Sequence, residues 1–161
     1  MDYLNGAQHS IFRFEYLQDF SATDRDEFAK WQNHELDIAQ LGKGWWNDLR
    51  VLHKRGVVTQ RVRRVVRPMN DYTKFELEIH KESARHGDKI KIIDDDLFQV
   101  FNVNLRDFWL VDDKTALKMN YGDAGRYEGF SIDEDVEKYV KAKELLWRHS
   151  LPIGEKFIPE I

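Results

Sequence analysis

Three short apolar segments in the last third of the chain, joined by two tight turns, do most to narrow the possible folds. The segments are 108–111, 115–121 and 126–131, and the turns are Asp-Asp-Lys at 112–114 and Gly-Asp-Ala-Gly at 122–125. Gly and Asp are common in such turns because they tolerate the backbone conformations that hairpins require. The spacing predicts a three-stranded antiparallel meander against which the rest of the chain must pack.

Other periodic segments predict further strands and about four helices. Strands are expected at 11–16, at 57–67 and at 89–93, the last followed by an acidic corner at 94–96. Helices are expected at 24–39 and 45–55, and a last helix is expected to follow the capping box Ser131–Glu134. A helix is also favoured at 71–86, with Asn70 as its N-cap, over a strand through Phe75, Leu77 and Ile79. Together these elements predict an α+β fold with a mainly antiparallel sheet of about four to five strands, packed by about four helices.

Length and composition indicate one folded domain. The 161 residues are about the size of a single domain, and 10 Phe, 6 Tyr and 5 Trp are far too many aromatic residues for a disordered chain. We therefore expect a single domain over 1–161, with irregular ends at 1–10 and 150–161, where two of the three prolines lie.

Several classes of site are excluded by missing residues. The chain has no cysteine, which removes disulfides, thiolate metal centres and a cysteine nucleophile. It has no glycine-rich phosphate loop and no paired-histidine zinc motif, so no cofactor and no metal ligand set are assigned. No apolar stretch approaches the roughly 20 residues of a membrane span, and we expect a cytoplasmic protein without membrane contact.

One charge anomaly stands out in an acidic chain of formal net charge −4. The segment 50–67 contains no carboxylate and seven basic residues: Arg50, Lys54, Arg55, Arg61, Arg63, Arg64 and Arg67. Arg61 and Arg63 are expected on one strand face, about 6.6 Å apart at roughly 3.3 Å per residue, which resembles the spacing of successive phosphates. Trp45, Trp46 and Tyr72 lie nearby in sequence and suit stacking on bases.

Pairing with carboxylates, inside the chain or on a partner protein, is the favoured interpretation of this segment, ahead of phosphate recognition. Arg64 shares a predicted strand face with the buried valines, and it therefore needs a carboxylate partner because an unpaired buried charge is costly.

An enzyme is the alternative class. A metal-free ribonuclease uses His, Arg, Tyr and Glu as acid, base and phosphate clamp. The set to test is His80, Glu76, Arg61 and Arg63. A carboxylate–metal phosphodiesterase site is also open, although turn or surface roles fit the acidic residues better.

Several segments in order resemble a known family. They are Phe12-Arg13-Phe14-Glu15, Arg61-Val62-Arg63 through Pro68, Asp71-Tyr72 with Phe75-Glu76-Leu77, Gly87-Asp88 before Ile90, Asp107 to Asp113 and Tyr121 to Arg126. The chain resembles a bacterial family, common in actinobacteria, of domains of unknown function, over roughly Ser10 to Phe157. It departs from that family in having Asn120-Tyr121-Gly122 where His-Tyr-Asp is more usual.

The resemblance implies a stand-alone cytoplasmic domain, often encoded beside helix-turn-helix regulators, and assigns no catalytic residue. It therefore favours an accessory or regulatory role, including one in a toxin–antitoxin or defence module. The matched polar positions implied to line a shared pocket are Arg13, Glu15, Arg61, Arg63, Tyr72, Glu76, Asp107, Trp109 and Arg126.

The sequence predicts a binding domain that presents segment 50–67 to an anionic partner, either a protein or a nucleic acid. The alternative is a small nuclease or phosphodiesterase acting as a toxin or defence effector. The expected binding residues are Arg61, Arg63, Arg67, Lys54, Arg55, Tyr72, Arg13, Glu15, Asp107, Trp109 and Arg126.

Overall fold

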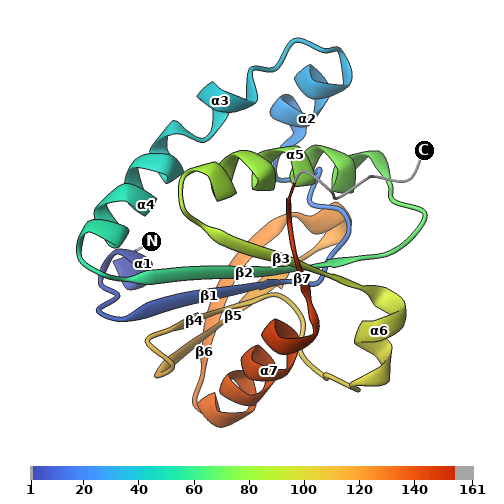
Figure 1. Ribbon diagram of the computed structural model, residues 1–161. Helices are drawn as coiled ribbons and strands as arrows, with labels where there is room; N and C mark the ends of the chain where they lie inside the picture. The colour runs from blue at the N-terminus through green and yellow to red at the C-terminus, as the bar shows by residue number, and fades with distance from the viewer. Residues whose placement is uncertain (1, 155–161) are drawn as a thin grey trace.

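A seven-stranded sheet with helices on both faces forms the centre of the computed structural model, which describes residues 2–154 (Figure 1). The strand order is β6-β5-β4-β1-β2-β3-β7. The strands are β1 (Ser10–Glu15), β2 (Val58–Val65), β3 (Lys89–Asp94), β4 (Phe108–Val111), β5 (Thr115–Tyr121), β6 (Tyr127–Asp133) and β7 (Leu151–Pro152). The helices are α1 (Asp2–Asn5), α2 (Arg25–Gln32), α3 (Ile38–Leu41), α4 (Lys43–Lys54), α5 (Asp71–Arg85), α6 (Asp95–Val100) and α7 (Val136–His149), with the 3-10 turn η1 (Asp123–Gly125).

The α+β class is confirmed, but the sheet is mixed and larger than predicted. β1, β2 and β3 are parallel neighbours, whereas β4, β5, β6 and β7 join antiparallel. Residues 2–154 form seven strands and seven α-helices, against the predicted four to five strands and about four helices. The parallel centre arises because α4 precedes β2 and α5 lies between β2 and β3, and crossovers of this kind return the chain to the same end of a sheet.

The predicted meander is present as β4, β5 and β6, but its last strand is longer than expected. Ser131 lies inside β6, where it pairs with Lys118 of β5, and β6 continues to Asp133. The predicted capping box is therefore wrong, and α7 begins at Val136. The expected acidic corner at 94–96 is instead the start of α6, with Asp94 at its N-cap position.

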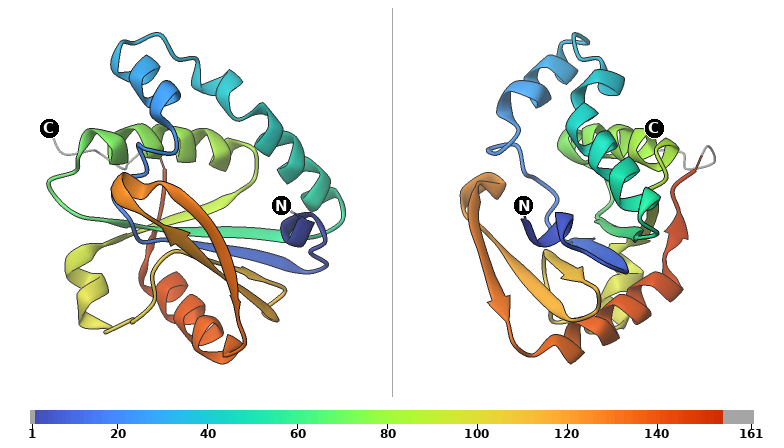
Figure 2. Two further views of the ribbon diagram at one scale, coloured as in Figure 1. Left: turned by 180° about the vertical axis from the view of Figure 1, so that it is seen from behind. Right: turned by 90° about the vertical axis from the view of Figure 1, so that its left-hand side faces the viewer.

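The helix predicted at 24–39 is broken in two. α2 ends at Gln32, His34 has a left-handed backbone with φ 59°, and α3 is a single turn. Neither helix has a fully buried side chain, and Phe28 and Trp31 are only partly buried against the cluster around Phe75. Figure 2 shows this arm, coloured light blue to cyan, running along the outside of α5.

The chain ends are more regular than predicted where they can be described. Residues 2–5 form α1, and Leu151–Pro152 adds a short edge strand to β3. Residues 1 and 155–161, part of the predicted irregular ends, lie outside the described residues. Among residues 2–154, no helix is long and apolar enough to cross a membrane.

The two faces of the sheet differ in chemistry because residues alternate along each strand. Phe12 and Phe14 of β1 point to the face covered by α6 and α7, where they pack with Phe108, Leu110 and Leu146 in an apolar core. The intervening residues of β1 point to the opposite face, beneath α4 and α5, and they include two charged side chains. That polar face positions the candidate site.

Candidate functional site

Strand register gathers charged side chains into two rows across the sheet. In the parallel pair β1 and β2, Arg13 lies opposite Arg61, and Glu15 lies opposite Arg63. From the other side, Trp109 of β4 lies opposite Arg13. The guanidinium carbons of Arg13 and Arg61 lie 5.4 and 5.5 Å from the Trp109 ring centroid. A short alternating pattern on each strand is thus enough to build a charged layer.

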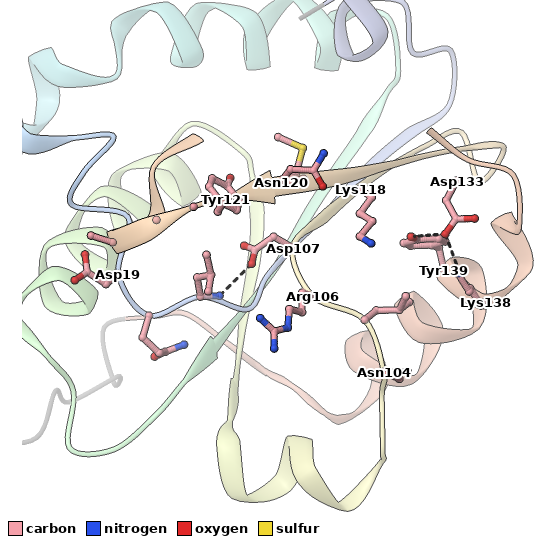
Figure 3. A pocket seen from close by; sticks show the side chains of 17 residues that line it. Asp19, Asn104, Arg106, Asp107, Lys118, Asn120, Tyr121, Asp133, Lys138 and Tyr139 are labelled. Atoms are coloured by element: carbon pink, nitrogen blue, oxygen red, sulfur yellow. Dashed lines mark hydrogen bonds and ion pairs between the residues drawn. The ribbon is translucent and has the colours of Figure 1, made fainter. Parts of the chain in front are cut away.

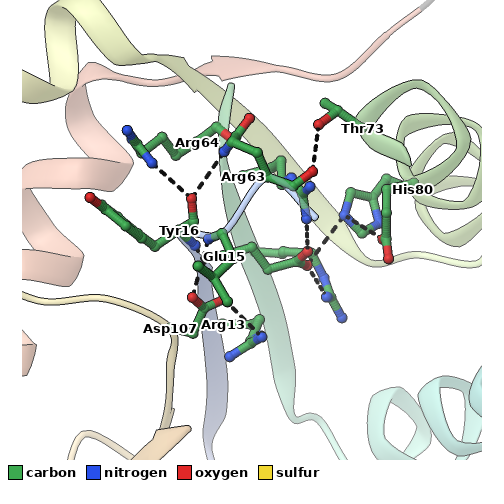
Figure 4. Close-up of polar contacts among 12 residues, drawn as sticks. Arg13, Glu15, Tyr16, Arg63, Arg64, Thr73, His80 and Asp107 are labelled. Carbon is green, nitrogen blue, oxygen red and sulfur yellow. Dashed lines mark hydrogen bonds and ion pairs between the residues drawn. The ribbon is translucent and has the colours of Figure 1, made fainter. Parts of the chain in front are cut away.

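Glu15 is the centre of this layer (Figure 4). Arg63 Nη1 donates to Glu15 Oε2 at 2.6 Å, Arg61 donates to Glu15 Oε1, and His80 Nε2 lies 3.2 Å from Oε1. The side chains of Glu15, Arg63 and His80 are at most 5% exposed. Burial alone would raise the pKa of Glu15, but His80 and the two guanidiniums outweigh it and hold that pKa well below its usual value.

A second buried pair fixes the loop before β4. Arg13 Nη2 lies 3.2 Å from Asp107 Oδ1, and the backbone N–H groups of Tyr16 and Leu17 also donate to this carboxylate. Arg13 donates in addition to the hydroxyl of Tyr121 at 3.1 Å. Burial raises the pKa of Asp107, although Arg13 and the backbone N–H of Leu17 oppose that effect. The predicted residues Arg13 and Asp107 therefore tie β1 to the meander.

Helix α5 supplies the wall opposite the sheet. Asn70 caps it by accepting from Thr73 N at 2.7 Å, as the sequence predicted. Tyr72, Glu76 and His80 follow at intervals of four residues and so share one helix face. Tyr72 Oη lies 2.6 Å from Glu76 Oε1, and Glu76 Oε2 lies 3.7 Å from His80 Nε2.

A cleft of two adjoining chambers lies between this helix and the charged layer. The first chamber, of about 400 Å³, is walled by Trp45, Trp46, Phe75, Ile79 and His80. The second chamber, of about 270 Å³, is walled by Arg13, Glu15, Phe20, Trp109 and Tyr121. Thr23, Asp24, Arg61 and Glu76 line both chambers. We call the two chambers together the α5 cleft.

Buried nitrogen atoms without a hydrogen-bond acceptor concentrate around the α5 cleft. Arg13 Nη1, Arg61 Nε, Trp45 Nε1 and Trp46 Nε1 are buried donors of this kind, and all four residues line the cleft. Arg61 Nε has only a distant ionic contact, 3.7 Å from Asp88 Oδ2. Because buried polar groups are nearly always hydrogen-bonded, such a concentration of unmatched donors calls for an acceptor in the cleft.

A larger cavity of about 810 Å³ lies beside β5 and the start of α7 (Figure 3). Three of its polar side chains pair with one another: Asp133 contacts Lys138 at 2.8 Å and accepts from Tyr139 at 2.9 Å. Within residues 2–154, none of the buried nitrogens without an acceptor belongs to a residue lining this cavity. The α5 cleft is therefore the better candidate site, although it is the smaller space.

The structure pairs the arginines of strand β2 inside the chain. Arg61 and Arg63 bind Glu15, and Arg64 Nε donates to Asp95 Oδ1 at 2.7 Å on the opposite face of the sheet. The prediction that Arg64 needs a carboxylate partner is confirmed. Since Arg63 is fully buried, Arg61 and Arg63 do not form an exposed stripe with phosphate spacing.

Seven of the predicted binding residues do not line the cleft. Arg63, Tyr72 and Asp107 are buried, and the other four are exposed at the surface. Arg67 Nε donates to Asp94 Oδ1 at 2.7 Å, and Arg126 contacts Glu128 at 3.1 Å. Arg55 donates to two backbone carbonyls of the segment before β1, at 3.0 and 2.6 Å, and Lys54 is exposed at the end of α4. The structure thus divides the predicted set between a buried group and a surface group.

Sequence reasoning missed Asp24 and Tyr121 as parts of the site, and it named Trp45 and Trp46 only as stacking residues near the basic segment. Asp24 has the place of a helix N-cap, but its side chain makes no capping bond to α2 and contacts Tyr72 Oη instead. The contact of Asp24 with the cleft becomes visible only when Tyr72 of α5 is placed beside it in the folded chain. The four-residue spacing of Tyr72, Glu76 and His80 was the one signal available in the sequence.

Glu15, Glu76 and His80 have the composition of a metal site, with one potential ligand atom of each lying within 4.8 Å of the others. However, both oxygens of Glu15 already accept from guanidiniums, and two positive charges beside a ligand oppose cation binding. The contacts fit an ion-pair and proton-sharing network better than a metal centre.

Fold and cleft together define a small mixed α+β domain with a buried, charged cleft on one sheet face. The chain belongs to the family described as a domain of unknown function, DUF6879, whose model matches residues 1–157. The resemblance to an uncharacterised domain family is thereby confirmed. No curated protein matches the chain.

Proposed function

We propose that this is an accessory or regulatory binding domain that takes an anionic group of its ligand or partner into the α5 cleft. The observation that carries the proposal is the set of buried N–H donors without acceptors on Arg13, Arg61, Trp45 and Trp46. A carboxylate or phosphate oxygen offers several acceptor sites to such donors, and charge-assisted bonds to arginine are the stronger ones.

The mode of binding follows from burial. The Arg61 side chain is only 14% exposed and Arg63 is 0% exposed, so a phosphate backbone laid across β2 could not reach both. A small molecule, or a single side chain or terminal group of a partner, can enter the cleft. The anion is therefore proposed to contact only Arg61 of segment 50–67, and not the whole basic segment.

The walls favour a ligand with a flat or apolar part beside its anion. Trp45 and Trp109 lie edge to face, with ring centroids 6.1 Å apart, and Phe75 and Ile79 line the first chamber. Cavities of a few hundred cubic ångströms with apolar walls and a few polar groups are typical of small-molecule sites. A cytoplasmic, regulatory setting beside a DNA-binding regulator is part of the same proposal.

Tryptophan fluorescence tests the proposal, because three of the five Trp residues line the cleft. The probes are sulfate, adenosine monophosphate and a short single-stranded RNA. Arg61→Lys retains the positive charge and loses the guanidinium donors, and we expect it to weaken binding about tenfold, as for one lost charge-assisted bond. The matched control is Arg85→Lys. The Arg85 side chain is 76% exposed at the end of α5, so this variant should bind the probes as the wild type does.

Salt dependence separates entry of one anion from binding along a basic strand. One phosphate contact with single-stranded RNA gives a log–log slope of about −0.7, whereas four contacts on duplex DNA give about −3.6. A shallow slope lost in Arg61→Lys supports the cleft. A steep slope unaffected by Arg61→Lys, or no binding of any probe, would overturn the proposal.

A small nuclease is the second candidate, favoured by one observation. His80, Glu76, Arg61 and Arg63, which the sequence singled out as a possible catalytic set, lie together at the cleft and around Glu15. Its test is cleavage of labelled RNA in the presence of EDTA and of magnesium. Cleavage abolished by His80→Ala supports an enzyme, and binding without cleavage at high protein concentration rejects it.

A further inference from the structure

The hydroxyl of Tyr72 lies between the carboxyl groups of Asp24 and Glu76, two residues that line both chambers. It contacts Asp24 Oδ2, and it lies 2.6 Å from Glu76 Oε1. A phenol carries one proton and can donate it to only one of these oxygens. The other contact is a hydrogen bond only if that carboxyl group carries a proton of its own. The geometry therefore requires an extra proton in the Asp24–Tyr72–Glu76 trio.

The charge balance of the surrounding cluster leads to the same conclusion. Three guanidiniums, those of Arg13, Arg61 and Arg63, and the imidazole of His80 face five carboxyl groups, so the carboxyl groups outnumber the basic groups even with His80 counted. The carboxyl groups are those of Glu15, Asp24, Glu76, Asp88 and Asp107. Unpaired buried charge is strongly unfavourable, so protons on this cluster stabilise it.

Asp24 is the better place for the extra proton. Glu76 has a basic neighbour in His80, whereas the charged neighbours of Asp24 are mainly other carboxylates. Burial raises the pKa of Asp24, and Glu76, Glu27 and Glu15 raise it further, against the opposing hydrogen bond from Tyr72. The groups facing Asp24 are thus Tyr72 and Glu76 from α5, Glu27 from α2 and Glu15 from β1, with Arg61 of β2 lining the same chambers.

We propose that Asp24 is a neutral carboxylic acid which, together with Arg61, forms the subsite for the ligand's oxyanion. This inference rests on the proposed function and deepens it. A neutral Asp24 does not repel an anion, whereas an ionised Asp24 does. The proton of Asp24 is held in the contact with Tyr72, and Arg61 Nε, which has no acceptor, supplies the hydrogen bond to the anion. The subsite therefore takes a carboxylate, sulfate or phosphate group, and its affinity falls as pH rises and Asp24 ionises.

Sulfate is the probe because it stays a dianion across the useful pH range. Asp24→Asn replaces the acid with a neutral donor of the same shape that cannot ionise. We expect the two proteins to bind sulfate alike at the acid end of the pH range, where Asp24 holds its proton. At about pH 8.5, where the wild-type Asp24 is ionised and repels the anion, we expect the variant to bind about tenfold more tightly. Both proteins contain His80, so its contribution cancels in this comparison.

The matched control is Asp26→Asn on the exposed first turn of α2. It makes the same chemical change close to Asp24 in sequence without touching the cleft lining. We expect it to leave sulfate affinity unchanged at both pH values. An equal effect of Asp26→Asn would show that general charge, not the subsite, governs binding.

A second measurement needs no ligand and separates this proposal from the proposed function. Carboxyl carbon NMR of the uncomplexed protein, with Asp24 assigned by the signal missing in Asp24→Asn, should show that Asp24 keeps its proton to a pH above the ordinary range of aspartic acid. An Asp24 signal that ionises within that ordinary range overturns the neutral acid, whether or not sulfate binds. Sulfate binding that depends on Arg61 but is identical in wild type and Asp24→Asn at both pH values also overturns it, and leaves the proposed function standing.

Discussion

Arg63 Nη1 lies 2.6 Å from Glu15 Oε2, and the two side chains are 0% and 4% exposed. In the chain, 47 residues lie between Glu15 and Arg63, and only the register of β1 with β2 brings the two charges together. The pair shows how the basic strand of an acidic protein is neutralised from within. Because the pair is buried, the stability of the domain should depend strongly on it.

Glu15→Gln should strongly destabilise the domain, because it leaves two buried guanidiniums without their carboxylate. Removing one partner of a buried ion pair costs about 3–5 kcal/mol. Urea denaturation at neutral pH measures this loss. Glu128→Gln is the control, because Glu128 and Arg126 are 46% and 68% exposed and such pairs contribute about 0–1 kcal/mol. Equal losses in the two variants would contradict the buried network.

Asp112→Asn should reduce stability and flatten its dependence on acid pH. Asp112 accepts from the backbone N–H groups of Gln8, His9 and Ser10 at 2.6–3.1 Å, pinning the segment before β1 to the β4–β5 turn. Burial would raise the pKa of Asp112, but these donors outweigh it and lower the pKa. A lowered pKa means stability that is present above the unfolded value, about 3.9, and is lost as pH falls through the folded value.

The measurement for Asp112 is urea denaturation at several pH values between about 2 and 7. Asn tolerates the left-handed backbone at this position, φ 54°, so the substitution tests the carboxylate rather than the turn. We expect a loss of about 1 kcal/mol at neutral pH that disappears in acid. A loss that is constant with pH would contradict the assignment.

Gly125→Ala should be far more disruptive than Gly129→Ala. Both glycines have a positive φ, 71° and 101°, so both substitutions strain the backbone. A Cβ at Gly125 would also collide with the backbone of Asp19 and Phe20, whereas a Cβ at Gly129 meets nothing within 4 Å. We expect the thermal midpoint of Gly125→Ala to fall well below that of Gly129→Ala, and equal midpoints would refute the close approach.

Gly44→Ala should stabilise the protein. Gly44 lies within α4, is exposed, and would place a Cβ in open space. Alanine is favoured over glycine in helices by about 0.5–1 kcal/mol. An increase in the free energy of urea unfolding checks this, and a decrease would show that α4 is not helical at this residue in solution.

Local patterns predicted the elements whose structure depends on nearby residues. Helix α5 could be predicted because Asn70 caps it and Tyr72, Phe75 and Ile79 follow helical spacing. The meander could be predicted because its turns contain residues that suit positive backbone angles, as at Asp112 and Asp113. Both signals are contained within a few residues.

Strand pairing and the full cleft depend on contacts between distant segments, and the sequence did not determine them. The parallel pairing of β1 with β2 joins segments about 48 residues apart and leaves no local signature. Asp24 illustrates the same difficulty for the site. Its position before a helix indicates a cap, and only the folded chain shows its carboxylate against Tyr72.

The outer arm formed by α2 and α3 has a consequence for exchange kinetics. Glu27 of α2 and Leu41 of α3 line the first chamber, yet neither helix contributes a fully buried side chain. Segments with little buried apolar surface detach at a free-energy cost below that of global unfolding. The amides of this arm should therefore exchange with deuterium sooner than those of β1 and β2. Because Glu27 and Leu41 line the first chamber, opening of the arm should also shorten the residence of any molecule held there.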